Sequence, residues 1–200
     1  MDSLYNKILN YNFEYLFKKK KYAYFIKGCY NLNIIGIRRS DNKVDNKFDD
    51  FMVVIYNTPL KQECRAIYQI TTQPGITYME NPSNSKGTAI LVEGQYRGAY
   101  KLGKHKGQNA LIQNKDLLVY RDKNKDKIYD YITSTIDKGK FGINIHRAGK
   151  NSTQINNWSA GCQVFAKDSE FEAFLRLCNL QVKNGYGSTF TYTLINEREL

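Results

Sequence analysis

Short β-prone runs recur along most of this chain, and their spacing limits the folds that it can adopt. Runs rich in Val, Ile, Tyr, Phe and Thr return at intervals of about 8 to 12 residues, separated by turns that contain Gly, Asn, Asp or Lys. This spacing is typical of a β sandwich or barrel, so we predict an α+β fold with a mostly antiparallel β core. The runs are residues 24–26, 32–37, 51–56, 64–71, 89–92, 99–102, 110–113, 117–120 and 189–195.

Two segments break this pattern and predict helices. In residues 3–20, apolar side chains recur at spacings of three and four, with Ser3 as the expected N-cap. A second helix is predicted from Asp168 up to Gly185, which ends it. We expect residues 1–30 to form a helical extension packed on a domain of residues 31–200. The predicted buried stripes are Leu4, Ile8, Tyr11 and Tyr15, and Phe171, Phe174, Leu175, Cys178 and Val182.

The chain is strongly basic, with a formal net charge of +11. Such a charge favours anionic partners, for example nucleic acid or an anionic cell-wall polymer. The densest run, residues 18–21, is more typical of a solvated helix end than of a binding patch. No nucleic-acid-binding motif accompanies the charge, so nucleic acid is not the expected partner. The sequence shows neither a secretory pattern nor an apolar run that could span a membrane, so we expect synthesis in the cytoplasm.

Metal chemistry is not expected from this sequence. The four cysteines contain no C-x-x-C pair, and the chain has only two histidines. Free thiols in a reducing compartment explain the cysteines more simply than disulfides do. Residues 122–126, with the order D-x-N-x-D, match the first half of a calcium loop, but Lys127 replaces the usual glycine. A solvated β-turn is the favoured interpretation there, and we expect neither a metal nor another cofactor.

A candidate active site lies between residues 141 and 165. The apolar residues 141–145 predict a strand with His146 at its end, and Cys162 follows sixteen positions later, before the next predicted strand. A cysteine nucleophile needs a base to form its thiolate, and histidine is the usual partner. Because a loop between adjacent strands can bring these side chains together, the spacing indicates a nucleophile–base pair.

The turn before the cysteine, Ser159-Ala160-Gly161-Cys162, supports this interpretation. Glycine lets the backbone approach a substrate closely, and backbone amides in such a turn can stabilise an oxyanion. Taken singly, His146 is more simply a polar residue at a strand end, and Cys162 a small buried hydrophobe. Together with Ser159 and Gly161, the pattern favours catalysis.

The histidine followed by an S-x-G-C turn resembles the signature of L,D-transpeptidase (YkuD-type) catalytic domains. Residues 72–75, with the order T-Q-P-G, and residues 98–113 are similar to further parts of that family. The resemblance covers about residues 32–165 at the level of motifs. It implies a mostly antiparallel sandwich or barrel of L,D-transpeptidase type, with one helix after the catalytic strand.

The resemblance also implies a role for each residue of the motif. Cys162 would attack a carbonyl of the peptidoglycan stem peptide and form a thioester, with His146 as the base. Gly161 and the Cys162 amide would help to form the oxyanion site. Ser159 would hold the turn or orient the histidine. The acyl group would then pass to an amine or to water, so the same site can support transpeptidation or hydrolysis.

Three positions depart from the family pattern. Ala160 stands where histidine is common, Val164 where arginine is common, and Arg147 where glycine or serine is common. Arg147 can supply the missing cation for a carboxylate, although an exposed loop arginine is equally expected. His105 lies in the region that faces the site in the family, although an exposed loop histidine is again equally expected. The candidate substrate-binding residues are Arg147, Trp158, His105 and Gln163.

The resemblance extends to a biological setting. Residues 31–38 and 144–164 are similar to phage and Bacteroidetes versions of the family. This implies a phage lysis enzyme or a virion-associated enzyme that reaches the cell wall by release rather than through a signal peptide. The alternative is a catalytically silent protein on the same fold that binds the wall or forms part of a virion.

Overall fold

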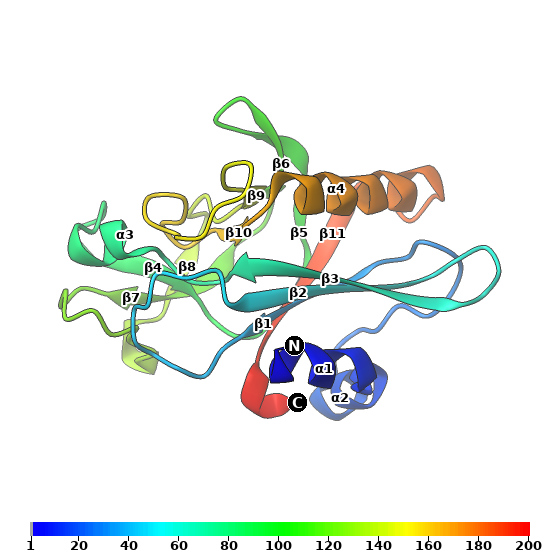
Figure 1. Ribbon diagram of the computed structural model, residues 1–200, viewed down its shortest axis with the longest axis horizontal. Helices are drawn as coiled ribbons and strands as arrows, with labels where there is room; N and C mark the ends of the chain where they lie inside the picture. The colour runs from blue at the N-terminus through cyan, green and yellow to red at the C-terminus, as the bar shows by residue number, and fades with distance from the viewer. Residues whose placement is uncertain (1) are drawn as a thin grey trace.

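The computed structural model describes residues 2–200 and is built around a closed barrel. The strand order is β1-β11-β5-β6-β9-β10-β3-β2 (Figure 1). Neighbouring strands are antiparallel except for β1 with β11 and β9 with β10. The barrel strands are β1 (Asn33–Arg38), β2 (Asp50–Asn57), β3 (Glu63–Thr71), β5 (Gly94–His105), β6 (Gln108–Gln113), β9 (Ile145–Arg147), β10 (Gln163–Phe165) and β11 (Thr189–Asn196).

A second, three-stranded sheet and a few helices complete the fold. The sheet has the order β4-β7-β8, with strands Thr88–Leu91, Leu117–Asp122 and Asp137–Gly139. The predicted α+β class with a mostly antiparallel β core is therefore confirmed, although α3 and β8 were not predicted. No helix within residues 2–200 is long and apolar enough to cross a lipid bilayer. The helices are α1 (Ser3–Asn10), α2 (Phe13–Lys20), α3 (Ile76–Glu80) and α4 (Asp168–Lys183), with 3-10 turns η1 (Thr133–Thr135) and η2 (Glu197–Glu199).

Strand β1 is buried on both faces, which explains how the N-terminal helices attach. Successive residues of a strand point to opposite faces. Ile34 packs in the main core, which also contains the apolar stripe of α4. Ile35 and Ile37 pack instead in a second core with Leu4 and Ile8 of α1. The N-terminal helices therefore cover the face of β1 that the main core leaves free.

The single helix predicted for residues 3–20 is wrong, because the chain forms two helices there. The Asn12 side chain accepts a hydrogen bond from the Tyr15 amide at 3.0 Å and starts α2 as its N-cap. This break rotates the second half of the predicted stripe, so that Tyr15 is 64% exposed rather than buried. The buried residues of α2 are Phe13, Leu16 and Phe17.

Two helix details also differ from the predictions. Asp2, rather than Ser3, caps α1 by accepting a hydrogen bond from the Leu4 amide. In α4, Val182 is 37% exposed, and Gln181 occupies the buried position instead. The Gln181 side-chain oxygen accepts a hydrogen bond from the Leu32 backbone amide at 3.2 Å, so the buried Gln181 side chain keeps a hydrogen-bond partner.

The predicted strand at residues 24–26 does not form. The Asn33 side chain replaces a neighbouring strand there, because it accepts from the Phe25 amide at 2.8 Å and donates to the Phe25 carbonyl at 2.9 Å. Strand β5 is much longer than the predicted run of residues 99–102. His146 lies in the middle of the short strand β9, rather than after a strand of residues 141–145.

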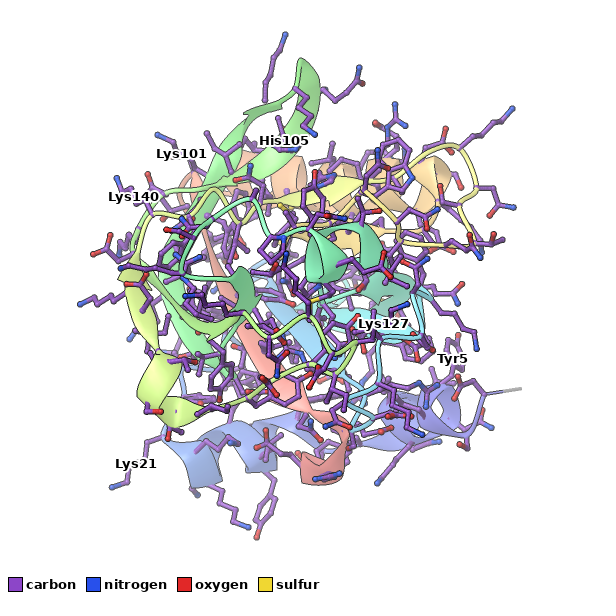
Figure 2. The ribbon with its side chains drawn as sticks, turned by 90° about the vertical axis from the view of Figure 1, so that its left-hand side faces the viewer. Tyr5, Lys21, Lys101, His105, Lys127 and Lys140 are labelled. Atoms are coloured by element: carbon purple, nitrogen blue, oxygen red, sulfur yellow. The ribbon has the colours of Figure 1, made fainter. Side chains whose placement is uncertain are left out.

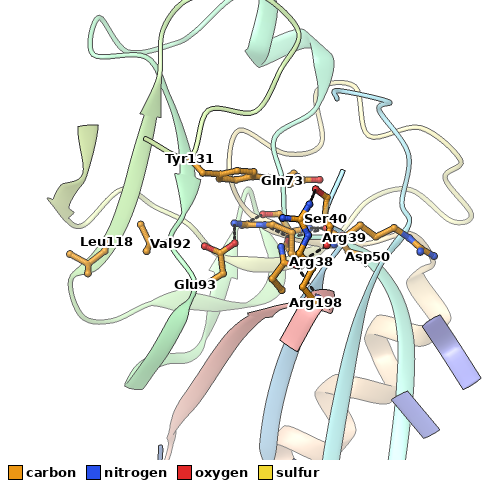
Figure 3. Close-up of polar contacts among 12 residues, drawn as sticks. Arg38, Arg39, Ser40, Asp50, Gln73, Val92, Glu93, Leu118, Tyr131 and Arg198 are labelled. Carbon is orange, nitrogen blue, oxygen red and sulfur yellow. Dashed lines mark hydrogen bonds and ion pairs between the residues drawn. The ribbon is translucent and has the colours of Figure 1, made fainter. Parts of the chain in front are cut away.

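A buried polar cluster joins the barrel to the second sheet (Figure 3). The Arg38 guanidinium is fully buried and donates to the Thr72 hydroxyl, the Thr72 carbonyl and Glu93, each at 3.0 Å. Asp50 accepts from the Thr72 amide at 2.7 Å and from its hydroxyl at 2.8 Å. The Tyr131 ring centroid lies 5.4 Å from the Arg38 guanidinium carbon. Each buried charge in this cluster is therefore paired.

Candidate active site

Strands β9 and β10 bring the predicted histidine and cysteine together. They pair in parallel, with His146 opposite Val164. The Gln163 amide donates to the Asn144 carbonyl at 2.9 Å, so Cys162 lies beside Asn144 just before the paired residues. Because alternate residues of extended chain point to the same side, Cys162 and His146 emerge on one face. Sequence spacing thus predicted the correct pair of neighbouring segments.

His146 is held as a neutral base. Its Nδ1 lies 2.9 Å from the Arg147 carbonyl oxygen, which can only accept, so Nδ1 carries the ring proton. Its Nε2 is buried and has no hydrogen-bond partner within residues 2–200. Burial, opposed in part by the hydrogen bond to Arg147, lowers the pKa of His146 to about 4. At neutral pH the ring therefore offers an unpaired lone pair at Nε2.

Cys162 is a protonated thiol in this arrangement. Its Sγ accepts from the Asn144 amide at 3.4 Å and donates to the Gly142 carbonyl at 3.5 Å. Burial raises the pKa of Cys162 to about 11, although the Asn144 amide acts in the opposite direction. No hydrogen bond joins Cys162 to His146 among the described residues. Catalytic hydrogen bonds of this kind are often long without substrate and shorten when it binds.

The turn before Cys162 depends on Ser159 and on a glycine at 161. The Ser159 hydroxyl donates to the Cys162 carbonyl at 2.8 Å and accepts from the Gly161 amide at 3.1 Å. Gly161 has a φ of +119°, and a Cβ there would lie 2.4 Å from the Ala89 carbonyl oxygen. Only glycine fits this backbone without a shift. Ser159 thus holds the turn, and no hydrogen bond from it to His146 is found within residues 2–200.

These contacts change the expected oxyanion site. The Gly161 amide is already bonded to Ser159, so it is not free to bind a substrate oxygen. The Cys162 amide has no acceptor within the part of the chain that the structure describes. It is therefore the backbone donor that remains for an oxyanion beside the thiol.

An open cleft of about 80 Å³ lies against His146. Three of the four predicted substrate-binding residues line it, namely His105, Arg147 and Trp158. The fourth, Gln163, does not line the cleft, because its side chain is fully buried and accepts from the Tyr192 hydroxyl at 2.7 Å. Gln163 therefore supports the strand beside the cysteine instead of facing a substrate. The other lining residues are Lys106, Gln108, Asn109, His146 and Asn157.

The charges around the cleft are positive. Lys106 and Arg147 line it, and none of the lining residues is acidic. The Arg147 guanidinium donates to the Ala148 carbonyl at 3.1 Å and to Gln108 at 3.4 Å, which leaves further N–H groups available. The cleft therefore suits a ligand that carries a carboxylate. The lysine-rich end of α2 does not contribute, since His105 and Lys21 lie at opposite ends of the molecule (Figure 2).

Sequence reasoning missed two residues that organise the site, Gln113 and Asn144. The Gln113 side chain accepts from the three amides of residues 141–143 at 2.9, 2.9 and 3.1 Å, which fixes the segment that carries the Gly142 carbonyl. Asn144 contacts His105, whose ring stacks on His146 with centroids 4.5 Å apart. Asn144 precedes His146 by two positions, and this alternation is the signal that could have revealed it.

Metal-binding groups are not assembled in residues 2–200. No group of three or more His, Cys, Asp or Glu side chains there is placed to hold an ion. All four cysteines are free thiols. The segment that matches half a calcium loop forms internal hydrogen bonds instead, with the Asn124 amide donating to Asp126 at 3.0 Å and to Asp130 at 2.9 Å.

Comparisons with known proteins identify no relative of this chain. No family model matches the sequence, and no curated protein or solved structure matches it either. The resemblance to L,D-transpeptidases therefore stays a prediction that depends on the His146 and Cys162 motif. A function has to be proposed from the chemistry of the cleft.

Proposed function

We propose that this protein is a cysteine-dependent enzyme of L,D-transpeptidase type that acts on the stem peptides of peptidoglycan. The observation that carries the proposal is the buried, unpaired Nε2 of His146 on the same face as the Cys162 thiol. A buried polar atom without a partner is costly, so its retention favours a role in binding or chemistry. The S-x-G-C motif and the L,D-transpeptidase resemblance supply the reaction class.

The residues support a two-step acyl transfer. The thiol first exchanges its contact with the Gly142 carbonyl for one with His146 Nε2, which takes the thiol proton. The thiolate then attacks the peptide carbonyl carbon, and the developing oxyanion accepts from the Cys162 amide. When the C–N bond breaks, His146 returns the proton to the leaving amine and a thioester remains on Cys162.

The second step releases the acyl group. Water or an acceptor amine attacks the thioester, His146 takes its proton, and the Cys162 thiolate leaves and is reprotonated. Lys106 and Arg147 provide the positive charge that suits a carboxylate of the stem peptide. The basic surface would favour retention near anionic wall polymers. We place the enzyme at the cell wall after release, as a phage lysis enzyme or as part of a virion.

The decisive experiment compares wild type with Cys162→Ala on purified sacculi. Mass spectrometry of the products distinguishes hydrolysed stem peptides from newly cross-linked ones. Wild type should change the muropeptides, and Cys162→Ala should not, because it lacks the nucleophile. Cys29→Ala is the matched control, since that half-exposed thiol contacts Asn184 and does not belong to the strand pair that carries His146. Equal products from wild type and Cys162→Ala, or none from wild type, would refute the proposal.

A second candidate function is a wall-binding or virion structural protein without activity. The observation that favours it is the Cys162 thiol, which contacts the Gly142 carbonyl rather than His146 and has a pKa raised to about 11. The net charge of +11 would then provide adhesion to an anionic wall. Salt-sensitive sedimentation with sacculi, without released fragments, is the result expected from this alternative.

A further inference from the structure

The two histidines of the chain lie against each other at the cleft. Their rings are stacked with centroids 4.5 Å apart and an interplanar angle of 24°. His146 comes from β9, whereas His105 comes from the end of β5, next to the hairpin turn into β6. Both rings line the cleft, so their free nitrogens decide which hydrogen bonds a ligand can form there.

Backbone groups determine the proton position on His105 through Asn144. The Gln113 amide donates to one end of the Asn144 side chain at 2.9 Å, and an amide N–H can only donate, so that end is the oxygen. The other end is then the NH₂ group, which lies 3.0 Å from His105 Nδ1 and donates to it. His105 Nδ1 is therefore an acceptor, and the proton of the neutral ring is on Nε2.

The neighbouring histidine has the opposite arrangement. The Arg147 carbonyl requires a proton on His146 Nδ1, which leaves Nε2 as an acceptor. The stacked rings thus differ in tautomer, and each tautomer follows from a backbone group with a fixed role. A positive charge on His105 is disfavoured, because it would need Nδ1 to be protonated against the Asn144 NH₂ group and because Lys106 lies nearby.

We propose that His105 is a hydrogen-bond donor of the cleft and contacts a carbonyl oxygen of the substrate through Nε2–H, beside the base His146. The part of this inference that concerns substrate rests on the proposed function. His105 would donate to the substrate carbonyl, while the lone pair on His146 Nε2 stays available for the proton of the Cys162 thiol. Asn144 is a positioning residue, because it acts only through His105.

The tautomers can be read directly, since the chain contains only two histidines. A long-range ¹H–¹⁵N correlation spectrum at neutral pH should show one ring protonated on Nδ1 and the other on Nε2. His105→Gln removes one of the two ring systems and thereby assigns the other. Two Nδ1–H rings, or a charged His105 at neutral pH, would overturn the inference whether or not the protein cleaves peptidoglycan.

Asn144→Asp tests the cause of the tautomer. A carboxylate cannot donate, so His105 should move its proton to Nδ1 in this variant while His146 keeps its own. An unchanged His105 ring would show that Asn144 does not set its tautomer. Near-ultraviolet circular dichroism identifies any general loss of packing, and Asn144→Ser, which retains a small donor, provides a second variant if Asn144→Asp fails to fold.

Two substitutions of His105 separate the donor from the stacked ring. His105→Phe keeps a stacked ring without a donor and should lower kcat on the order of 100-fold. His105→Gln has no ring but places an N–H near the Nε2 position, so it should recover most of that loss. Equal losses in both variants would overturn the donor role. If wild type changes no muropeptides while the two tautomers are found as expected, the proposed function fails and the His105 donor assignment stands.

Discussion

The molecule contains two buried polar clusters that are constructed in opposite ways. In the cluster around Arg38, each charged group has partners, including a hydrogen bond from the Arg39 amide to Asp50 at 2.8 Å. In the cluster around His146, one buried ring nitrogen has no partner within residues 2–200, and the thiol makes only long contacts there. The difference indicates that the first cluster serves stability, while the second keeps hydrogen-bonding capacity for a ligand.

The largest loss of stability should come from a substitution in the cluster around Arg38. Arg38→Met leaves Glu93 without its ion-pair partner and removes a nearby positive charge from the buried Asp50, and should lower the free energy of unfolding by about 4 kcal/mol. Urea unfolding followed by circular dichroism measures this change. Arg198→Met, at an exposed position nearby, is the control and should cost at most about 0.5 kcal/mol. Similar losses in the two variants would contradict the structural role of Arg38.

The cluster around His146 should make the free energy of unfolding depend on pH. His146 has a pKa lowered from 6.5 to about 4 by burial. The unfolded chain therefore takes up a proton at this residue as the pH falls below 6.5, before the folded ring does, and His146 by itself should contribute a loss of about 3 kcal/mol of stability by pH 4. His146→Phe should lack this loss while being as stable as wild type, or more stable, at pH 7.

The difference between the two proteins isolates His146 from other titrating groups. Burial raises the pKa of Asp49 to about 7 and that of Asp122 to about 6, and both carboxyls remain in the variant. These two groups favour the folded state as the pH falls, which is opposite in sign to His146. Parallel pH profiles for wild type and His146→Phe would refute the neutral, buried histidine.

The next largest loss of stability is expected from a substitution at Gly161, in the turn before Cys162. Gly161→Ala combines a φ of +119° with a Cβ only 2.4 Å from a carbonyl oxygen, and should cost about 2 kcal/mol. Gly107→Ala is the matched control, because it also has a positive φ but has no atom within 4 Å of the added Cβ. Thermal or urea unfolding of both variants separates the cost of the steric clash with Ala89 from the cost of an alanine at positive φ. Equal costs would mean that the contact with Ala89 is unimportant.

The smallest effect is expected at Ser159. Ser159→Ala removes two hydrogen bonds of the turn and should lower stability by about 1 kcal/mol. It also frees the Gly161 amide, so activity should fall less than in Cys162→Ala. Ser152→Ala, which loses one half-buried hydrogen bond from the Gly149 amide, is the comparison variant in both assays. A complete loss of activity in Ser159→Ala with full stability would indicate a direct role in chemistry.

Much of the architecture could be predicted from local pattern. Alternation and turn residues located most of the barrel strands, since these signals depend on nearest neighbours in sequence. The same reasoning failed at Asn12 and Asn33, where a side chain satisfies backbone groups that a helix or strand would otherwise satisfy. Such competition depends on individual hydrogen bonds, which a periodicity does not contain.

The sequence alone determined the motif, the strand pair that carries it, and the need for glycine in the turn before Cys162. Tertiary structure decided which of its groups are free to bind a ligand. The Gly161 amide is bonded to Ser159, Gln163 is buried, and His146 Nε2 has no partner in the part of the chain that the structure describes. It also placed His105, from a distant hairpin, against His146 and fixed both tautomers through backbone groups. Hydrogen-bond partners and burial arise from contacts between segments far apart in the chain, so no local pattern could have assigned them.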